Sequence, residues 1–247
     1  MRRNQVYRMI DRAAGWLLPP RCVLCRGPGQ SPALDLCVAC EAELPRVSRP
    51  CRRCGLPGLA GKVGIARGER CARCQSIELP YARCLAPWAY EFPVTRLVQA
   101  LKYEGALANA RVFGMQLAAF AGPAMDPGRE ATLIVPMPLH PRRLVERGFN
   151  QSREIARVVA RTVDRPLVES ALRRVRETVH QVGLTREERL GNLSGAFMAN
   201  AVIVAGKRVI LVDDVVTTGS TAAEAATTLA AAGAAHVEVW AVARALG

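Results

Sequence analysis

The sequence predicts an α/β fold with a parallel sheet, preceded by a small cysteine-rich module. Eight of the nine cysteines fall in residues 1–80, where loop-forming stretches such as GPGQSP and GLPGLAGKVG separate them. From about residue 81, apolar runs typical of buried strands alternate with segments whose apolar spacing is typical of helices. This alternation favours parallel strands joined by helices. We therefore expect an N-terminal helix and metal module in 1–80 and an α/β domain in 81–247.

The expected elements follow in order along the second part. Strands are expected at 82–92, 131–139, 209–212 and 236–244, and helices at 93–105, 106–122, 148–163 and 219–234. Residues 165–170 are expected to form a short strand or a turn. Two apolar runs flank Gly206, and the second of them is the strand at 209–212.

Composition narrows the class of protein. The 247 residues are 50% hydrophobic, which excludes a disordered chain. No apolar run reaches the roughly 18 residues of a membrane helix. The longest apolar stretch near the N-terminus, Ala13 to Leu18, is shorter than the core of about 7–15 residues in a signal peptide. We therefore expect a cytoplasmic protein without a membrane span, and the sequence leaves its oligomeric state open.

The cysteines form four CxxC pairs, a spacing that lets two thiolates reach one metal ion. Two such pairs close a tetrahedral zinc site, so eight ligands suit two structural zinc ions. Sequential pairing is the simplest arrangement, although the sequence leaves crossed pairing open. The expected ligands are Cys22, Cys25, Cys37 and Cys40 for one site, and Cys51, Cys54, Cys71 and Cys74 for the other.

Two alternatives to zinc are a redox pair and an iron–sulfur cluster. Four CxxC pairs would be an unusual redox device. The module has few large apolar residues, so metal binding and folding should be coupled, and a site closed by four thiolates has no open position for catalysis. The ninth cysteine, Cys84, is expected to be a buried apolar residue in a strand.

The charge is uneven. The formal net charge is +13, and residues 1–80 hold 14 basic and 6 acidic side chains. Two zinc sites with four thiolates each would lower the net charge to about +9. Nucleic-acid contact is one interpretation of the remaining basic surface. A simple preference for arginine is the other. The candidate contacts are Arg46, Arg49, Arg52, Arg53, Arg67, Arg70 and Arg73.

The stretch VILVDDVVTTGST indicates a site for a sugar phosphate. Asp213 and Asp214 follow a buried strand, at the carboxyl end where ligands bind in open α/β sheets. The next residues open a helix, and their backbone N–H groups and hydroxyls suit a phosphate. Carboxylates beside a phosphate site suit a ligand that also carries vicinal hydroxyls, such as a ribose 5-phosphate. The expected ligand-binding residues are Val215, Val216, Thr217, Thr218, Gly219, Ser220 and Thr221.

This stretch resembles the motif that binds phosphoribosyl pyrophosphate (PRPP) in type I phosphoribosyltransferases. The resemblance implies a parallel sheet with helices on both faces, PRPP bound with Mg²⁺, Asp213 and Asp214 on the ribose hydroxyls, and Thr217 to Thr221 on the 5-phosphate. Three further stretches, ALKYEG, VPMPLHPRRLVERGFNQS and RETVHQVGLTREERLGNLSGAF, resemble the ComF family, as do the leading cysteine pairs, which look like its double zinc ribbon. The family is linked to natural transformation, the uptake of single-stranded DNA.

The resemblance also implies roles for residues outside the motif. The loop after the first core strand binds pyrophosphate in type I enzymes, so Arg142 and Arg143 are candidates for that group, together with Lys102. A solvated helix start and a helix-end charge are the ordinary interpretations of these residues. Residues 174–197 lie where type I enzymes carry a mobile loop, although an ordinary solvated turn fits equally.

The sequence is compatible with two functions. One is a phosphoribosyltransferase (a glycosyltransferase that transfers a pentosyl group) acting in DNA uptake, whose acceptor the sequence does not identify. The other is a non-catalytic module that senses PRPP or a nucleotide. In that second case the zinc ribbons would bind single-stranded DNA or a DNA-uptake partner.

Overall fold

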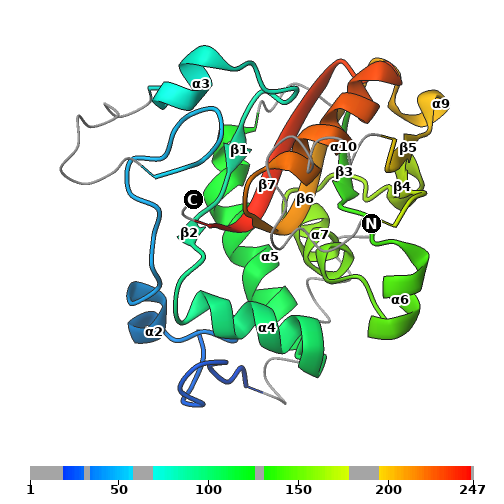
Figure 1. Cartoon of the computed structure of the whole chain (residues 1–247). Coiled ribbons are helices and arrows are strands. Elements are labelled where there is room, and N and C mark those ends of the chain that lie inside the picture. Colours follow the sequence, from blue (N-terminus) through cyan, green and yellow to red (C-terminus); the bar gives the residue numbers. More distant parts are fainter. Residues whose placement is uncertain (1–18, 31–33, 58–68, 126–130, 178–194, 246–247) are drawn as a thin grey trace.

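The computed structural model describes residues 19–30, 34–57, 69–125, 131–177 and 195–245 (Figure 1). The helix expected in residues 1–18 lies outside the described residues, as does Arg67. The described chain builds a central sheet with helices against it. Two small cysteine-rich segments lie along one side of this core (Figure 1).

The central sheet is parallel throughout, which confirms the predicted fold class. Its order is β1-β7-β6-β3, and β2 also pairs with β7. The stretch expected as one strand at 82–92 is instead two short strands, because Pro87 between them has no N–H for the ladder. The strands are β1 (Cys84–Leu85), β2 (Trp88–Ala89), β3 (Thr132–Pro136), β6 (Arg208–Val216) and β7 (His236–Arg244).

Helices cover both faces of this sheet. Alternate residues of the strands face opposite sides. Ile134, Ile210 and Trp240 pack with α4 (Val94–Glu104), α5 (Leu107–Ala121) and α7 (Gln151–Thr162). Val135, Leu211 and Val239 pack on the other face, with α10 (Ser220–Ala231). All four helices lie within the ranges expected from the sequence.

Shorter elements complete the described chain. The apolar run before Gly206 forms the short helix α9. Two further strands, β4 and β5, pair antiparallel on either side of residues 178–194, which lie outside the described residues. The shorter elements are α2 (Val38–Ala42), α3 (Ala72–Ser76), η1 (Gly122–Ala124), α6 (Pro141–Arg147), η2 (Glu169–Ala171), β4 (Leu172–Arg174), β5 (Phe197–Ala199) and α9 (Ala201–Val204).

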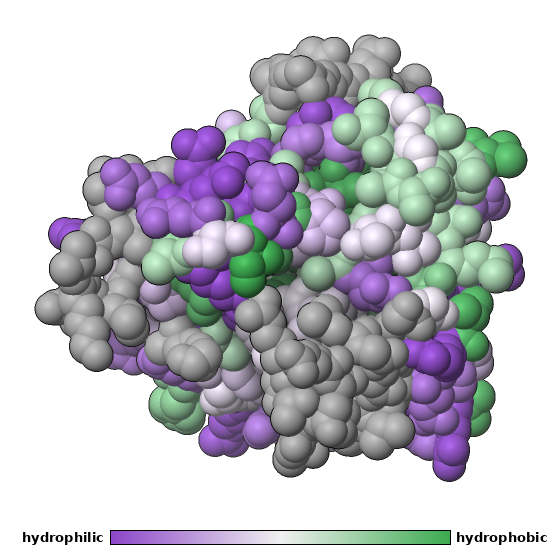
Figure 2. Space-filling model, turned by 45° about the horizontal axis from the view of Figure 1, so that its top comes forward, coloured by the Kyte–Doolittle hydropathy of each residue, from purple (hydrophilic) through white to green (hydrophobic). Residues whose placement is uncertain are grey.

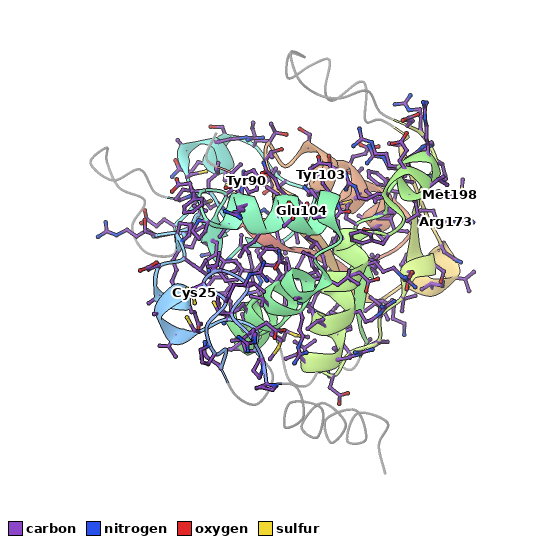
Figure 3. All side chains as sticks on the ribbon, turned by 90° about the horizontal axis from the view of Figure 1, so that it is seen from below. Cys25, Tyr90, Tyr103, Glu104, Arg173 and Met198 are labelled. Atoms are coloured by element: carbon purple, nitrogen blue, oxygen red, sulfur yellow. The ribbon has the colours of Figure 1, made fainter. Side chains whose placement is uncertain are left out.

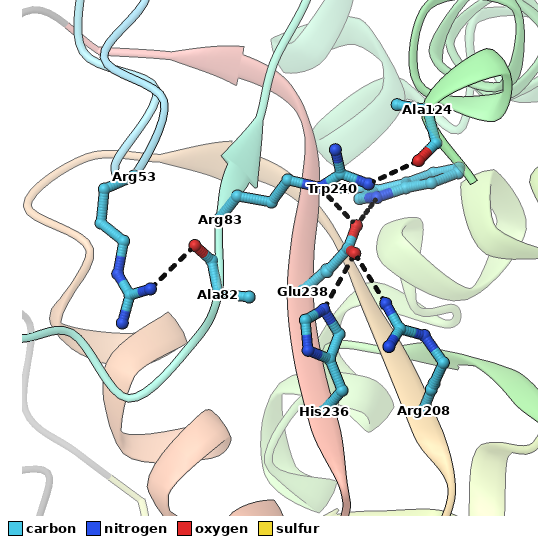
Figure 4. A network of polar contacts seen from close by, with 8 residues as sticks. All are labelled: Arg53, Ala82, Arg83, Ala124, Arg208, His236, Glu238 and Trp240. Carbon is cyan, nitrogen blue, oxygen red and sulfur yellow. Dashed lines mark hydrogen bonds and ion pairs between the residues drawn. The ribbon is translucent and has the colours of Figure 1, made fainter. Parts of the chain in front are cut away.

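The amino edge of the sheet holds a buried carboxylate, Glu238 (Figure 4). It accepts hydrogen bonds from Arg83 Nε at 2.9 Å and Arg208 Nη2 at 3.4 Å, and His236 Nε2 lies 3.0 Å away. Burial alone would raise the pKa of Glu238, but the bonds from Arg83 and its other neighbours outweigh burial and lower it. This edge is therefore electrostatically satisfied.

None of the helices in the described ranges is long and apolar enough to cross a membrane.

Figure 2 shows a broad hydrophilic area in the upper left of the face turned toward the viewer. Among the described residues of the second cysteine segment, Arg52, Arg70, Arg73 and Glu78 are exposed.

Candidate functional site

The carboxyl end of β6 opens into a pocket of about 120 Å³. Asp213 lines it together with every residue from Val215 to Ala222. Met137 to Leu139, which follow β3, also line it, as expected where neighbouring parallel strands end at one edge. The structure thus brings Asp213 and the residues of the Thr217–Thr221 turn into one site.

The two adjacent carboxylates have different environments. Asp213 Oδ1 accepts hydrogen bonds from Ser152 Oγ at 3.0 Å and from the backbone N–H of Asp214 at 2.9 Å. Asp214 is buried, and its Oδ2 lies 2.9 Å from Lys102 Nζ. Burial, together with the neighbouring Asp214 charge, raises the pKa of Asp213 to about 7. The ammonium of Lys102 is therefore the counter-charge in contact with this pair of adjacent carboxylates.

Lys102 lies in the last turn of α4, which extends toward the end of β6. Burial of its ammonium works to lower the pKa of Lys102. Asp214, which pairs with it directly, and Asp213 outweigh this effect and raise the pKa. The structure therefore places Lys102 against the carboxylate pair.

The turn after β6, residues Thr217–Thr221, presents backbone N–H groups and hydroxyls at the start of α10, and we call it the anion cup. Gly219 caps α10 with a left-handed φ of 82°, a conformation that side chains disfavour. The hydroxyls of Thr218 and Ser220 lie 3.0 Å apart, and Ser220 N–H lies 3.4 Å from Thr218 Oγ1. The first N–H groups of a helix have no partner within it and attract anions.

A wider groove of about 780 Å³ lies between α4 and α6. Its cations are Lys102, Arg142, Arg143 and Arg147. Arg142 lies 3.4 Å from Glu146 and 3.5 Å from Glu177. These pairs are exposed and therefore weak.

The same groove holds aromatic side chains. Tyr103 is 75% exposed at the end of α4 (Figure 3), and the Arg147 guanidinium lies 5.4 Å from its ring centroid. Phe149 also lines the groove. The groove therefore offers both cationic and planar apolar groups.

Asn150 and Gly148 have capping roles beside the groove. Asn150 Oδ1 accepts from the N–H of Ser152 at 3.0 Å at the start of α7, and Gly148 ends α6 with φ of 78°. These caps set the direction of the loop between α6 and α7. The amino end of α7 thereby brings Ser152 to Asp213.

Arg174 is the described residue of the expected mobile loop that reaches the pocket. Its guanidinium lies 5.6 Å from the ring centroid of Phe197, which closes the β4–β5 pair. Burial lowers the pKa of Arg174, and the nearby Arg143 cation adds to that effect. Thr178, His180, Gln181, Arg186, Arg189 and Asn192 of that loop lie outside the described residues.

The eight cysteines gather into two tetrads, in sequential order. Within each tetrad the sulfur atoms lie within 4.8 Å of one another. Cys25 Sγ lies 3.7 Å from Cys37 Sγ, and Cys54 Sγ lies 3.7 Å from Cys71 Sγ. Sulfurs at the corners of a tetrahedron with zinc–sulfur bonds of about 2.3 Å lie about 3.8 Å apart. The spacing and the donor set therefore fit two structural zinc ions.

Electrostatics support the same conclusion. Burial opposes ionisation of Cys22 and Cys51, yet backbone N–H groups directed at their sulfurs lower the pKa to about 6 and about 7. Burial raises the pKa of Cys54 to about 11, and the nearby Cys51 charge adds to that rise. Four thiolates this close together need a bound cation. The ninth cysteine, Cys84, is buried in β1, as expected.

The arginines expected to contact nucleic acid have different surroundings. Arg53 donates to the carbonyls of Leu79 at 2.6 Å and Ala82 at 3.0 Å, so it anchors the second tetrad to the chain entering β1. Arg73 Nη1 lies 3.5 Å from the carbonyl of Thr218 in the anion cup. Five arginines remain exposed: Arg46, Arg49, Arg52, Arg70 and Arg73.

Two site residues were not anticipated from the sequence. Ser152 is one. Arg244, the last residue of β7, is the other, and its guanidinium donates to carbonyls of the turn after β6. A charged residue at the end of a strand that is otherwise almost entirely buried was the available signal for Arg244.

Comparison with protein families gives two matches. Residues 13–75 match the double zinc ribbon domain, and residues 150–246 match the phosphoribosyl transferase domain. The first range contains all eight cysteines of the two tetrads. Residues 13–18 of that range lie outside the described residues. The second contains Asp213 and the anion cup.

Curated relatives cover nearly the whole chain. DNA utilization protein YhgH of Salmonella typhi is 34% identical over 235 residues, covering 93% of this chain and 99% of that protein. DNA utilization protein YhgH of Escherichia coli K12 is 33% identical, with the same coverage of both chains. Competence protein F of Haemophilus influenzae is 29% identical, covering 91% of this chain and 97% of that protein.

Solved structures show a more distant likeness. Glutamine PRPP amidotransferase from B. subtilis is 20% identical with a TM-score of 0.34, covering 53% of this chain and 25% of that one. A hypoxanthine phosphoribosyltransferase from Staphylococcus aureus is 11% identical with a TM-score of 0.34, covering 55% of this chain and 63% of that one.

Proposed function

The chain belongs to the ComF family, and from this premise we propose that it binds PRPP with Mg²⁺ and transfers the phosphoribosyl group in a process that serves DNA uptake. One observation carries the proposal: Asp213 and the Thr217–Thr221 cup line the same pocket. A carboxylate accepts hydrogen bonds from sugar hydroxyls, while the cup donates them to a phosphate. A ribose 5-phosphate carries both groups at a fixed separation.

The cationic groove supports the diphosphate end of the same ligand. Lys102 belongs to this groove and also contacts Asp214, so the groove and the carboxylate pair are continuous. Arg142 and Arg143 offer planar donor groups that suit phosphate oxygens. We assign the diphosphate to this groove. The exposed ring of Tyr103 could stack on a planar acceptor molecule.

In the proposed reaction, the bond between the anomeric carbon and pyrophosphate breaks, and a nitrogen nucleophile forms the new bond. The cup holds the sugar in place while Asp213 holds its hydroxyls. Arg142 and Arg143 take up the charge that develops on the departing pyrophosphate. Mg²⁺ bound with PRPP supplies further neutralisation of that charge.

Calorimetric titration with PRPP and Mg²⁺ tests the binding step. Asp213→Asn should weaken PRPP binding at least tenfold, because an amide accepts hydrogen bonds from hydroxyls less strongly than a carboxylate does. Glu43→Gln, which removes an exposed carboxylate on the first ribbon, is the matched control and should bind like the wild type. Equal affinity in Asp213→Asn would show that the ribose site is assigned wrongly.

A screen of nucleobases for pyrophosphate release tests the chemical step. Release with one base, abolished by Asp213→Asn, is expected of a transferase. Binding of PRPP without release by any acceptor would favour a sensing module instead.

The exposed arginines favour that second function, in which the ribbons bind single-stranded DNA. Such binding should weaken steeply with salt. Replacing both Asp213 and Asp214 with Ala separates the two functions. Transformation that survives this double change would indicate a ribbon function independent of PRPP, whereas its loss would tie DNA uptake to the PRPP site.

Metal analysis tests the tetrads. We expect two zinc ions per chain and loss of folded structure in the ribbons on chelation. A zinc content near zero, or a visible spectrum typical of iron–sulfur clusters, would contradict the assignment.

A further inference from the structure

Arg244 is a buried cation directly behind the anion cup. It is 2% exposed at the end of β7. Its Nη1 donates to the carbonyls of Val216 at 2.8 Å and Ala245 at 3.1 Å, and also to that of Thr217. Its Nε donates to the carbonyl of Cys54 at 3.0 Å. Every hydrogen bond that the structure gives this guanidinium, within the described ranges, goes to a backbone carbonyl.

These contacts orient the peptide groups of the cup. The carbonyls of Val216 and Thr217 turn toward Arg244, and that of Thr218 turns toward Arg73. In a trans peptide the following N–H points the opposite way. The N–H groups of residues 217, 218 and 219 are therefore directed away from the two arginines.

That direction is the side of the pocket. All residues from 215 to 222 line the pocket, whereas Arg73 and Arg244 do not, so the turn separates the arginines from it. Carbonyl oxygens directed into the pocket would repel a phosphate. Holding three successive carbonyls on the far side leaves their N–H partners free to face an anion.

The second tetrad supports this arrangement from behind. Cys54 belongs to the tetrad, and its carbonyl is held by Arg244. The N–H of Cys84 in β1 donates to the carbonyl of Arg53 at 2.8 Å, which fixes the same CxxC turn to the sheet. Gly55 in this turn has φ of 69°, and a Cβ there would lie 2.9 Å from the carbonyl oxygen of Cys84. The turn therefore packs closely on the sheet beside the cup.

The first tetrad packs elsewhere. Cys22 belongs to the apolar cluster that contains α4, α5 and α7, on the other side of the sheet from α10. The described residues of the first tetrad thus share no contact with Arg244 or the cup comparable to that of Cys54.

We propose that Arg244, assisted by Arg73, is a positioning residue that orients the amides of the anion cup, and that Arg244 couples the second metal tetrad to phosphate binding. The proposal rests on the proposed function, since it requires the cup to hold the 5-phosphate. Coupling between two sites is reciprocal. PRPP should therefore raise the zinc affinity of the second tetrad and leave that of the first unchanged.

The first test compares PRPP binding by Arg244→Met, Arg244→Lys and Arg73→Met, each with zinc content measured. Arg244→Met should weaken binding about tenfold to a hundredfold, the effect of losing one or two charge-assisted hydrogen bonds. Arg244→Lys should recover part of this loss. Arg73→Met should weaken binding about threefold, because Arg73 is exposed and makes one long contact. Arg46→Met, on the first ribbon, is the control.

The second test measures how zinc distributes at equilibrium between the protein and a competing chelator, with and without saturating ribose 5-phosphate. We expect the ligand to raise the affinity for one of the two zinc ions several-fold in the wild type, and for neither ion in Arg244→Met. If Arg244→Met does not fold, Arg244→Lys carries both tests, because lysine keeps the buried charge but lacks the planar fork of donors, and a partial loss of both effects is then expected.

The outcomes separate the two proposals. If the wild type binds neither PRPP nor ribose 5-phosphate, the proposed function fails. If the wild type binds but the arginine variants bind equally well, the function stands and the positioning role is wrong. A wild-type zinc affinity that is the same with and without the ligand would overturn the coupling.

Discussion

Carboxylates at the two edges of the central sheet differ in their charged neighbours and in the direction of their pKa shifts. At the amino edge, Glu238 lies among Arg83, Arg208 and His236, and its pKa is lowered. At the carboxyl edge, Asp213 and Asp214 share Lys102, and the pKa of Asp213 is raised to about 7. A carboxylate with enough cations stabilises the fold. A carboxylate pair with too few neighbouring cations can bind hydrogen-bond donors of a ligand. A perturbed pKa in such a pair is typical of functional sites.

The largest change in stability is expected at the amino edge. Glu238→Gln should lower the free energy of unfolding by about 3 kcal/mol at pH 7, because it leaves partly buried cations without their counter-charge. Urea denaturation measures this, and PRPP affinity of the folded variant should stay within about twofold of the wild type. A stability equal to that of the wild type would show that the amino edge is not the satisfied one.

The pH dependence of that effect follows from the lowered pKa. A depressed native pKa contributes stability above the unfolded value of 4.5, and this stability is lost as the pH falls through the native pKa. The difference between Glu238→Gln and the wild type should therefore shrink in acid.

Lys102→Met tests the cation that contacts Asp214 at the carboxyl edge. Removing it should destabilise the protein by about 2 kcal/mol at pH 8, since the buried Asp214 and the half-buried Asp213 then lack this counter-charge. The cost should be smaller than at Glu238 because Asp213 can take up a proton instead. Adding Asp214→Asn should restore most of the loss, and a double-mutant cycle without coupling would refute the ion pair.

Asp213→Asn should change stability with the opposite sign. A raised native pKa means that stability falls as the pH rises from about 4 to about 7 and stays low above that. The variant lacks this fall, so it should equal the wild type near pH 4 and exceed it by more than about 1 kcal/mol at pH 8, because a shift of a single pKa unit is already worth that much. Thermal unfolding at both pH values measures this. Destabilisation at pH 8 would mean that Asp213 is a structural residue.

Much of the fold was predictable because local patterns specify it. The strand at 209–212 and the helix at 219–234 have strong apolar patterns. The structure has β6 across the first range and α10 inside the second. Asp213 and the Thr217–Thr221 turn were recognisable because adjacent residues form that site. The prediction of one continuous strand at 82–92 was wrong, because a proline interrupts the hydrogen bonding between strands. The apolar pattern of the sequence carries no information about that interruption.

The sequence by itself determined the layered α/β core, the cysteine pairs and the short motif at the end of β6. Only the tertiary structure decided how the CxxC pairs combine, that Lys102 serves Asp214, and that Arg244 joins Cys54 to the anion cup. The physical reason is range. Periodicity and motifs act between neighbours in the chain, whereas buried charges find their partners across the fold, here 190 residues apart for Arg244 and Cys54.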